Sequence, residues 1–277
     1  SFRDRFDRPV FIVSTPRSGS TLLFETLERA PAVHTLGAES HWLIEDIPAL
    51  APAAHGWSSN RLTAADAAGE PVEALARSFY EQVRDREGRP ASGRIRLLEK
   101  TPKNSLRVPF FAAAFPDSLF VYLYRDVRQT LFSMMEAWAS GAFQTYPELP
   151  GWRGRAWSLL LVPGWERLNG LPLPEIVAHQ WATTTNVLLD DLEVLPKQRL
   201  SKLDYADLIA APQRAVETLC ASLGLDWDQR LGTDLPLSKT VVSRPRPEKW
   251  RSIAAVIEGV WPIVEQADAR ARAFLSA

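Results

Sequence analysis

The chain has 277 residues, 46% of them apolar, which suffices for a substantial core in one large α/β domain or two smaller ones. Its 32 basic and 33 acidic residues nearly cancel, which argues against broad binding to nucleic acids or anionic membranes. A single cysteine, Cys220, excludes an internal disulfide framework and a cysteine-based zinc site, and the four histidines show no metal-ligand spacing. No secretory signal pattern and no apolar run of membrane-spanning length is present, so we expect a cytoplasmic protein without a bound metal.

Short apolar strands alternate with amphipathic helices along the chain. LFVYLY at Leu119–Tyr124 is a continuous apolar run, as expected for a strand buried on both faces of a parallel sheet. The predicted strands are Val10–Ser14, Arg96–Glu99, Leu119–Tyr124 and Gln198–Leu203, and the predicted helices are Thr21–Arg29, Pro71–Arg86, Asn104–Phe115, Val127–Trp138, Glu175–Leu195, Pro212–Leu223 and a final helix after the segment SRPRPEKWR. This rhythm favours an α/β fold, with a parallel β-sheet flanked by helices, as a single domain over residues 1–277.

Two segments interrupt this alternation of strands and helices. Residues 48–70 are rich in Ala, Pro, Gly and Ser and predict a loop. Residues 139–175 are dominated by Pro, Gly and Trp, and we expect an irregular, lid-like insertion there. Such a lid would build an apolar pocket that excludes water, whereas a hydrophobic cluster beneath a long loop is the alternative.

The segment VFIVSTPRSGSTLL, residues 10–23, leads from a buried strand through a turn of small residues into a helix. This order is typical of a phosphate-binding loop, in which backbone N–H groups and a helix N-terminus converge on an anion. Compared with the pattern G-x-x-x-x-G-K-[ST], Ser14 and Ser20 replace the first glycine and the lysine, and a cation stands in the loop as Arg17. The loop predicts phosphate binding without the usual Mg-triphosphate chemistry; a Ser/Gly turn that merely caps a helix is the alternative.

A second candidate anion site follows the clearest strand. Arg125 comes directly after LFVYLY, and Ser133 lies on the next predicted helix. Since strand ends in an open parallel sheet face the ligand crevice, Arg125 and Ser133 are placed to share one anion. An ion pair between Arg125 and Asp126, with Ser133 facing the core, is the alternative.

Together, PRSGSTLL and YRDVRQTLFS resemble the 5′-phosphosulfate loop and the 3′-phosphate site of sulfotransferases, which use 3′-phosphoadenosine 5′-phosphosulfate (PAPS) as donor. The resemblance covers nearly the whole chain, because Glu-Lys-Thr-Pro, a Tyr-x-Asp-Leu segment and a basic tail follow in the same order. Arginine before Ser-Gly makes the loop more similar to bacterial and tyrosylprotein sulfotransferases than to the cytosolic phenol type. The resemblance implies a P-loop-type fold and metal-free transfer of a sulfuryl group from PAPS, with 3′-phosphoadenosine 5′-phosphate (PAP) as product.

The resemblance also assigns donor-binding positions from the loop to the tail. They are Arg17, Ser18, Gly19, Ser20 and Thr21 for the 5′-phosphosulfate, Arg125 and Ser133 for the 3′-phosphate, Tyr205 in DYADL near the adenine, and Ser243, Arg244 and Lys249 in the tail. The tail lacks the Arg-Lys-Gly signature of the cytosolic type.

Catalytic roles follow from the same resemblance. Lys100, in LEKTP, would lie by the bridging oxygen and stabilise the departing phosphate, with Arg17 as a further cation. The acceptor hydroxyl needs a base, and where phenol-type members place a histidine this chain has Pro102. Glu39 matches, with a one-residue insertion, the catalytic glutamate segment of tyrosylprotein sulfotransferases, and His41 is the alternative base.

The acceptor is expected to be a hydroxyl compound with a hydrophobic portion, because the insertion is rich in tryptophan and the balanced charge suggests no basic groove for a sugar chain. Some bacterial members are domains of polyketide assembly lines that sulfate an acyl-chain hydroxyl, and the abrupt start of the chain is compatible with such a larger protein. Two other functions stay open. One is a P-loop small-molecule kinase, which would need a lysine at position 20; the other is a module that binds PAP or PAPS without turnover.

Overall fold

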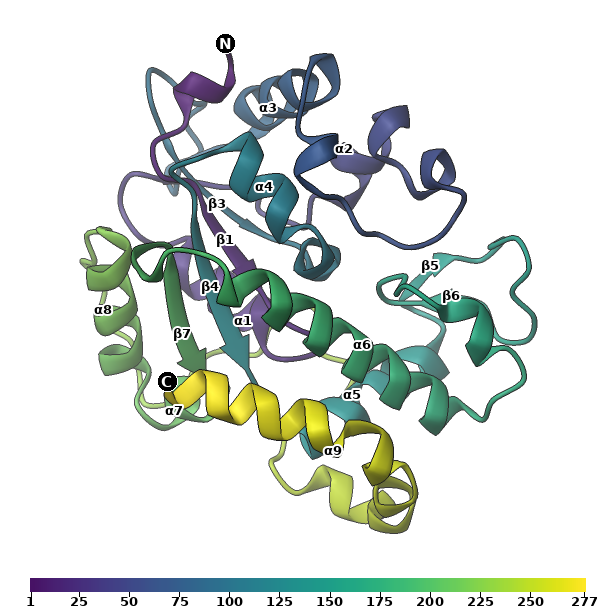
Figure 1. Ribbon diagram of the computed structural model, residues 1–277. Coiled ribbons are helices and arrows are strands. Elements are labelled where there is room, and N and C mark those ends of the chain that lie inside the picture. Colours follow the sequence, from purple (N-terminus) through teal and green to yellow (C-terminus); the bar gives the residue numbers. More distant parts are fainter.

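In the computed structural model, which describes residues 1–277, five parallel strands form one sheet in the order β2-β3-β1-β4-β7 (Figure 1). The strands are β1 (Val10–Val13), β2 (Val33–His34), β3 (Arg96–Lys100), β4 (Leu119–Tyr124) and β7 (Leu200–Asp204). The central strand β1 pairs on both sides, with Val10 opposite Leu98 of β3 and Leu119 of β4. The predicted parallel α/β fold is confirmed.

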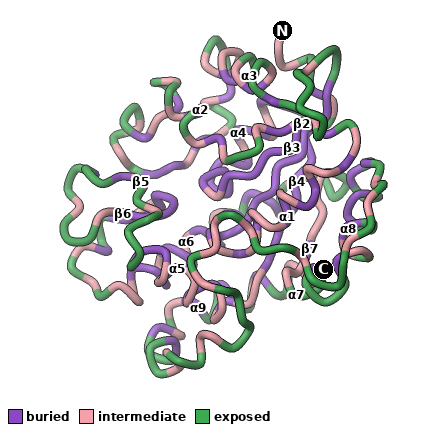
Figure 2. The backbone as a smooth tube through the Cα atoms, turned by 180° about the vertical axis from the view of Figure 1, so that it is seen from behind, coloured by how far each residue is buried: buried purple, intermediate pink, exposed green.

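Helices cover both faces of the sheet, and successive strand residues point to opposite faces. Phe11 and Phe120 enter the core beneath α3, α4 and α6, whereas Ile12 and Val121 enter the core beneath α1 and α8. Figure 2 shows the strands as a buried band through the molecule. The helices are α1 (Ser20–Leu27), α2 (His41–Glu45), α3 (Glu70–Gln82), α4 (Val108–Ala114), α5 (Val127–Ser140), α6 (Leu173–Glu193), α7 (Tyr205–Ala210), α8 (Pro212–Leu223) and α9 (Ala254–Ser276).

A third core lies where α5, α6 and α9 pack against residues 139–175. A short antiparallel pair, β5 (Gln144–Tyr146) and β6 (Trp157–Ser158), interrupts the otherwise irregular path of this insertion. Trp138, Trp157 and Trp165 are buried, and each indole N–H donates to a carbonyl or amide oxygen. The tryptophans therefore form a hydrophobic cluster that anchors the insertion. This is the alternative that the sequence had offered to a pocket wall.

The predicted start of the helix Asn104–Phe115 is wrong, because the structure has a 3-10 helix at Pro102–Leu106 and a separate helix, α4, that begins at Val108. Pro109 has no N–H, so a continuous α-helix would leave the Ser105 carbonyl without its partner four residues on. A second helix that begins at Val108 instead places Pro109 in its first turn, where proline is tolerated.

Candidate active site

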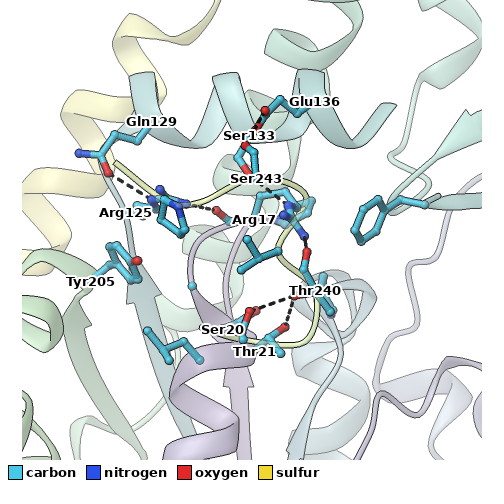
Figure 3. A pocket seen from close by; sticks show the side chains of 18 of the residues that line it. Arg17, Ser20, Thr21, Arg125, Gln129, Ser133, Glu136, Tyr205, Thr240 and Ser243 are labelled. Atoms are coloured by element: carbon cyan, nitrogen blue, oxygen red, sulfur yellow. Dashed lines mark hydrogen bonds between the residues drawn. The ribbon is translucent and has the colours of Figure 1, made fainter. Parts of the chain in front are cut away.

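A cavity of about 640 Å³ opens at the edge of the sheet where the parallel strands end. Residues that follow β1, β3, β4 and β7 meet there, because parallel strands present their carboxyl ends at one edge. Figure 3 shows how α5, the loop before α1 and a later segment without helix or strand face one another across this space. The cavity is lined by most of the residues predicted from the sequence: Arg17, Gly19, Ser20, Thr21, Glu39, His41, Arg125, Ser133, Tyr205, Ser243, Arg244 and Lys249.

The loop between β1 and α1 has the backbone shape of an anion site. Gly19 has a φ of 88° and Arg17 a φ of 65°, both in the left-handed region. A Cβ atom at Gly19 would lie 2.3 Å from Cδ2 of Tyr205, so only glycine fits there. Ser20 begins α1, and the unpaired N–H groups of its first turn lie at the cavity.

Ser18 is the one predicted loop residue that does not line the cavity. Its side chain is buried, and its hydroxyl lies 2.7 Å from the Thr15 hydroxyl. The Ser18 side chain therefore supports the loop from beneath.

Arg17 connects three walls of the cavity. Its Nε donates to the Ser133 hydroxyl of α5 at 3.1 Å, and its Nη1 donates to the Thr240 carbonyl at 2.9 Å (Figure 3). Its guanidinium carbon lies 4.7 Å from the centre of the Phe143 ring in the insertion. Ser133 thus contacts Arg17, rather than the Arg125 guanidinium with which the sequence grouped it.

Arg125 is the second cation beside the loop. Its Nη1 donates to the Arg17 backbone carbonyl at 3.0 Å, and its guanidinium carbon lies 4.8 Å from the centre of the Tyr205 ring. Burial lowers the pKa of Arg125, and burial together with the Arg125 charge lowers the pKa of Arg17. Neither arginine forms an ion pair with a carboxylate, so a bound anion would stabilise both charges.

Lys100 and Glu39 form an ion pair on the other side of the loop. The Lys100 ammonium, 3% exposed, donates to Glu39 Oε1 at 2.6 Å and to the Thr21 hydroxyl at 2.9 Å. His41 Nδ1 lies 3.6 Å from Glu39 Oε2. Burial and then the Lys103 charge lower the pKa of His41, against the opposing effect of Glu39, so the imidazole is neutral at pH 7.

The segment 226–248, which we call the strap, contains no helix or strand and passes beside the loop before α1. The Thr240 hydroxyl contacts the Thr21 hydroxyl at 3.2 Å, and the Ser243 hydroxyl donates to Glu136 of α5 at 2.7 Å. Lys249, just after the strap, donates to Ser243. The strap therefore forms one wall of the cavity.

Several polar cavity residues were not predicted from the sequence, among them Gln129, Glu136, Lys103 and Thr240. Gln129 accepts a hydrogen bond from Arg125 at 3.3 Å, and Glu136 accepts one from the strap. A signal existed for both, because Gln129, Ser133 and Glu136 recur at spacings of four and three and so share one face of α5. Lys103 gave no such signal, since its partner Glu45, at 2.8 Å, is distant in the sequence.

The part of the cavity formed by the insertion is mainly apolar, with Phe143, Leu159 and Leu160 in its wall. The nearby charges of Lys103 and Glu45 compensate each other in an ion pair. The Arg17 guanidinium over the Phe143 ring marks the border between this apolar part and the cationic surroundings of the loop.

No group of three or more acidic, histidine or cysteine side chains is placed to hold a metal ion. None of the helices combines the length and the apolar character that a membrane span requires.

Comparison with known proteins finds a family whose model matches most of the chain. The model described as "Sulfotransferase family" matches residues 9–229. Protein-tyrosine sulfotransferase A of Caenorhabditis elegans is 23% identical over 270 residues, which cover 92% of this chain and 62% of that protein. Protein-tyrosine sulfotransferase 2 of Gallus gallus is 22% identical over 223 residues, which cover 79% of this chain and 51% of that protein. The chain thus spans less than two thirds of the length of these relatives.

Solved structures share the fold. The sulfotransferase domain of the Synechococcus PCC 7002 olefin synthase is 19% identical, with a TM-score of 0.51 and 94% of each chain covered. Sulfotransferase STF9 from Mycobacterium avium is 14% identical, also with a TM-score of 0.51, over 94% of this chain and 76% of that chain. At such identities the likeness concerns the fold alone. The family match, however, includes the loop before α1, Lys100 and Arg125, and the chain belongs to the sulfotransferase family.

Proposed function

We propose that this protein transfers a sulfuryl group from PAPS to the hydroxyl of an uncharged, largely hydrophobic acceptor. The observation that supports this most is the meeting of Arg17 and Arg125 at the start of α1 without a carboxylate partner. A nucleotide that carries a phosphosulfate and a 3′-phosphate supplies the anions that these charges lack.

The donor would lie along the cavity from the loop to the strap. Backbone N–H groups at the start of α1, with the hydroxyls of Ser20 and Thr21, would hold the 5′-phosphosulfate. Arg125 and Ser133 would hold the 3′-phosphate, and Tyr205 would lie beside the adenine. The residues proposed to cover the nucleotide from the tail are Ser243, Arg244 and Lys249.

The reaction would be an in-line displacement at sulfur. A bond forms between the acceptor oxygen and sulfur while the bond from sulfur to the bridging oxygen breaks, which releases PAP. Lys100 would neutralise the charge that appears on the leaving phosphate, with Arg17 as the second cation. The proton of the acceptor hydroxyl would pass to the Glu39 carboxylate, and neutral His41 is the alternative base.

The apolar wall of the insertion supports a hydrophobic acceptor. Phe143, Leu159 and Leu160 would exclude water from the transferred group, and the charge of Lys103 is compensated by its ion pair with Glu45. Alkyl and aromatic alcohols fit these surroundings better than sugar chains. An acyl chain of an assembly line is a further candidate, since the olefin synthase domain has the same fold.

A calorimetric titration without acceptor tests the donor. We expect tight binding of PAP that does not depend on Mg²⁺, and no binding of Mg-ATP. Tight Mg-ATP binding without PAP binding would support a kinase, which Ser20 in place of the loop lysine disfavours.

Release of PAP from PAPS then tests turnover, with decanol, a hydroxyacyl pantetheine thioester, naphthol, a tyrosine peptide and glucose as acceptors. We expect transfer to the hydrophobic alcohols and none to glucose. PAP binding without transfer to any acceptor would support the non-catalytic module, although the Lys100–Glu39 pair has no role in such a module.

A further inference from the structure

Glu99 is a buried carboxylate that the proposed chemistry does not use. It lies near the end of β3, is 2% exposed and forms no ion pair, because the adjacent Lys100 contacts Glu39 instead. Burying an ionised carboxylate is costly unless hydrogen bonds replace the lost water. Its two oxygens accept hydrogen bonds from the Thr101 hydroxyl at 2.7 Å and from Asn104 Nδ2 at 2.5 Å.

The Thr101 hydroxyl connects Glu99 to the segment that carries both candidate bases. The same oxygen accepts a hydrogen bond from the Ser40 backbone N–H at 2.7 Å. That N–H belongs to the peptide between Glu39 and Ser40, and Ser40 and Thr101 are both fully buried. The hydroxyl therefore attaches the chain between Glu39 and His41 to the end of β3.

A hydroxyl has one proton and two lone pairs, so its direction depends on which neighbour takes the proton. The Glu99 carboxylate takes it here, which leaves the lone pairs of Thr101 free for the Ser40 N–H. Without an acceptor at Glu99, the proton would turn to the Ser40 hydroxyl, which lies 3.1 Å away.

We infer that Glu99 is a positioning residue for sulfuryl transfer: through Thr101 it holds the Glu39 carboxylate against the Lys100 ammonium. This inference rests on the proposed function, since the position of Glu39 matters only when Glu39 acts on the acceptor. Glu99 acts through Thr101 and does not itself line the cavity. The other charges near its carboxylate are Lys100 and Glu39, and Arg107 contacts Asn104 from the far side at 3.2 Å.

Ser105 offers a matched comparison in the same short segment. Its buried hydroxyl accepts from the Ser14 backbone N–H at 2.9 Å and donates to the Ser14 carbonyl. Ser14 begins the loop that would bind the donor. Two buried hydroxyls on one segment thus hold different halves of the site, Thr101 the base segment and Ser105 the donor loop.

The experiment compares T101V, T101S and S105A by the kcat for an active alcohol, the KM for PAPS and the Kd for PAP. T101V should lower kcat by about 10- to 100-fold, because a small displacement of a reacting group has this effect. Its Kd for PAP should stay within about 2-fold of wild type, since the donor loop is untouched. T101S keeps the hydroxyl and should restore kcat to within about 3-fold. S105A should show the opposite pattern, with PAP binding weakened by about 10-fold.

E99Q decides the question if T101V does not fold. Glutamine has the same shape but sets an N–H₂ group against one of the two donors, and it should lower kcat by about 10-fold with unchanged PAP binding. A folded T101V or E99Q with wild-type kcat overturns the inference, as does a parallel loss of kcat and PAP affinity. A wild-type protein that binds PAP but transfers to no acceptor overturns the proposed function, and this inference with it, before any variant is compared.

Discussion

One ammonium group, that of Lys100, lies 2.6 Å from the Glu39 carboxylate and 2.9 Å from the Thr21 hydroxyl of the donor loop. It therefore stands between the group proposed to take the proton and the group proposed to bind the donor. Changes on either side of Lys100 should affect different kinetic constants.

Glu39→Gln should lower kcat by about two to four orders of magnitude, because glutamine cannot accept the proton of the acceptor hydroxyl. The Kd for PAP should stay nearly unchanged, since Glu39 contacts Lys100 and His41 rather than the donor loop. Steady-state PAP release and calorimetry measure the two quantities.

His41→Asn is the companion variant for the choice of base. With Glu39 as the base, H41N keeps turnover within about 10-fold of wild type, well short of the loss expected on removal of the base. Wild-type turnover in E39Q combined with a large loss in H41N would transfer the role to His41.

Arg125→Met should weaken PAP binding by about 10- to 100-fold, because hydrogen bonds to a charged partner are worth about 1.5–3 kcal/mol. Arg128→Met is the matched control. The Arg128 guanidinium carbon lies 4.2 Å from the centre of the Trp261 ring, and Arg128 does not line the cavity. Equal losses of PAP affinity in both variants would show a general charge effect instead of a 3′-phosphate site.

Gly19→Ala should abolish measurable PAP binding, since its Cβ would collide with Tyr205 and its φ of 88° disfavours any side chain. Combining G19A with Tyr205→Ala removes the collision but not the backbone strain of about 1–2 kcal/mol. The collision is the main cause if G19A weakens PAP binding much less in the Y205A background than in the wild-type background. Undiminished PAP binding by G19A would contradict the loop geometry.

Glu99→Gln should change the pH dependence of stability. Burial raises the pKa of Glu99, so the folded protein holds this proton more tightly than the unfolded chain does. The free energy of unfolding then contains a contribution that is lost as pH rises above the ordinary glutamate range of about 4.3. Glutamine lacks this contribution, so the stability of E99Q relative to wild type should increase as pH rises above about 4.3 in urea titrations.

Glu45→Gln should change the pH dependence of stability in the opposite direction. Burial opposes ionisation of Glu45, but Lys103, Tyr146 and Arg107 outweigh it and lower its pKa. The stability that Glu45 contributes is present above the ordinary glutamate range and is lost as pH falls, so E45Q should lose stability relative to wild type as pH rises. If the stabilities of E99Q and E45Q relative to wild type changed in the same direction with rising pH, these assignments would be contradicted.

Much of the fold was predictable because its signals are local. LFVYLY marks β4 to the residue, and Pro212 at the start and Gly224 after the end delimit α8. The pair β5–β6 and the five-residue α2 were missed, since they depend on contacts with distant segments and have little periodicity of their own.

The cavity residues proposed to bind the donor were predictable for the same reason, since the loop and Arg125 each follow a recognisable strand. The residues on the proposed acceptor side were not. The Thr101–Ser40 hydrogen bond and the Lys103–Glu45 ion pair join residues that are far apart in the sequence, and no local pattern connects them. The number of tryptophans left open whether the insertion lines a pocket or forms a hydrophobic cluster, and packing places most of these rings in a core.

The insertion separates the residues that hold it in place from those that face the cavity. Trp138, Trp157 and Trp165 anchor it, whereas Phe143 and Leu159 meet the open space. The choice of ligand can therefore diverge among descendants of this protein, or under laboratory selection, by exchange of cavity-facing residues while the anchor and the global stability are retained.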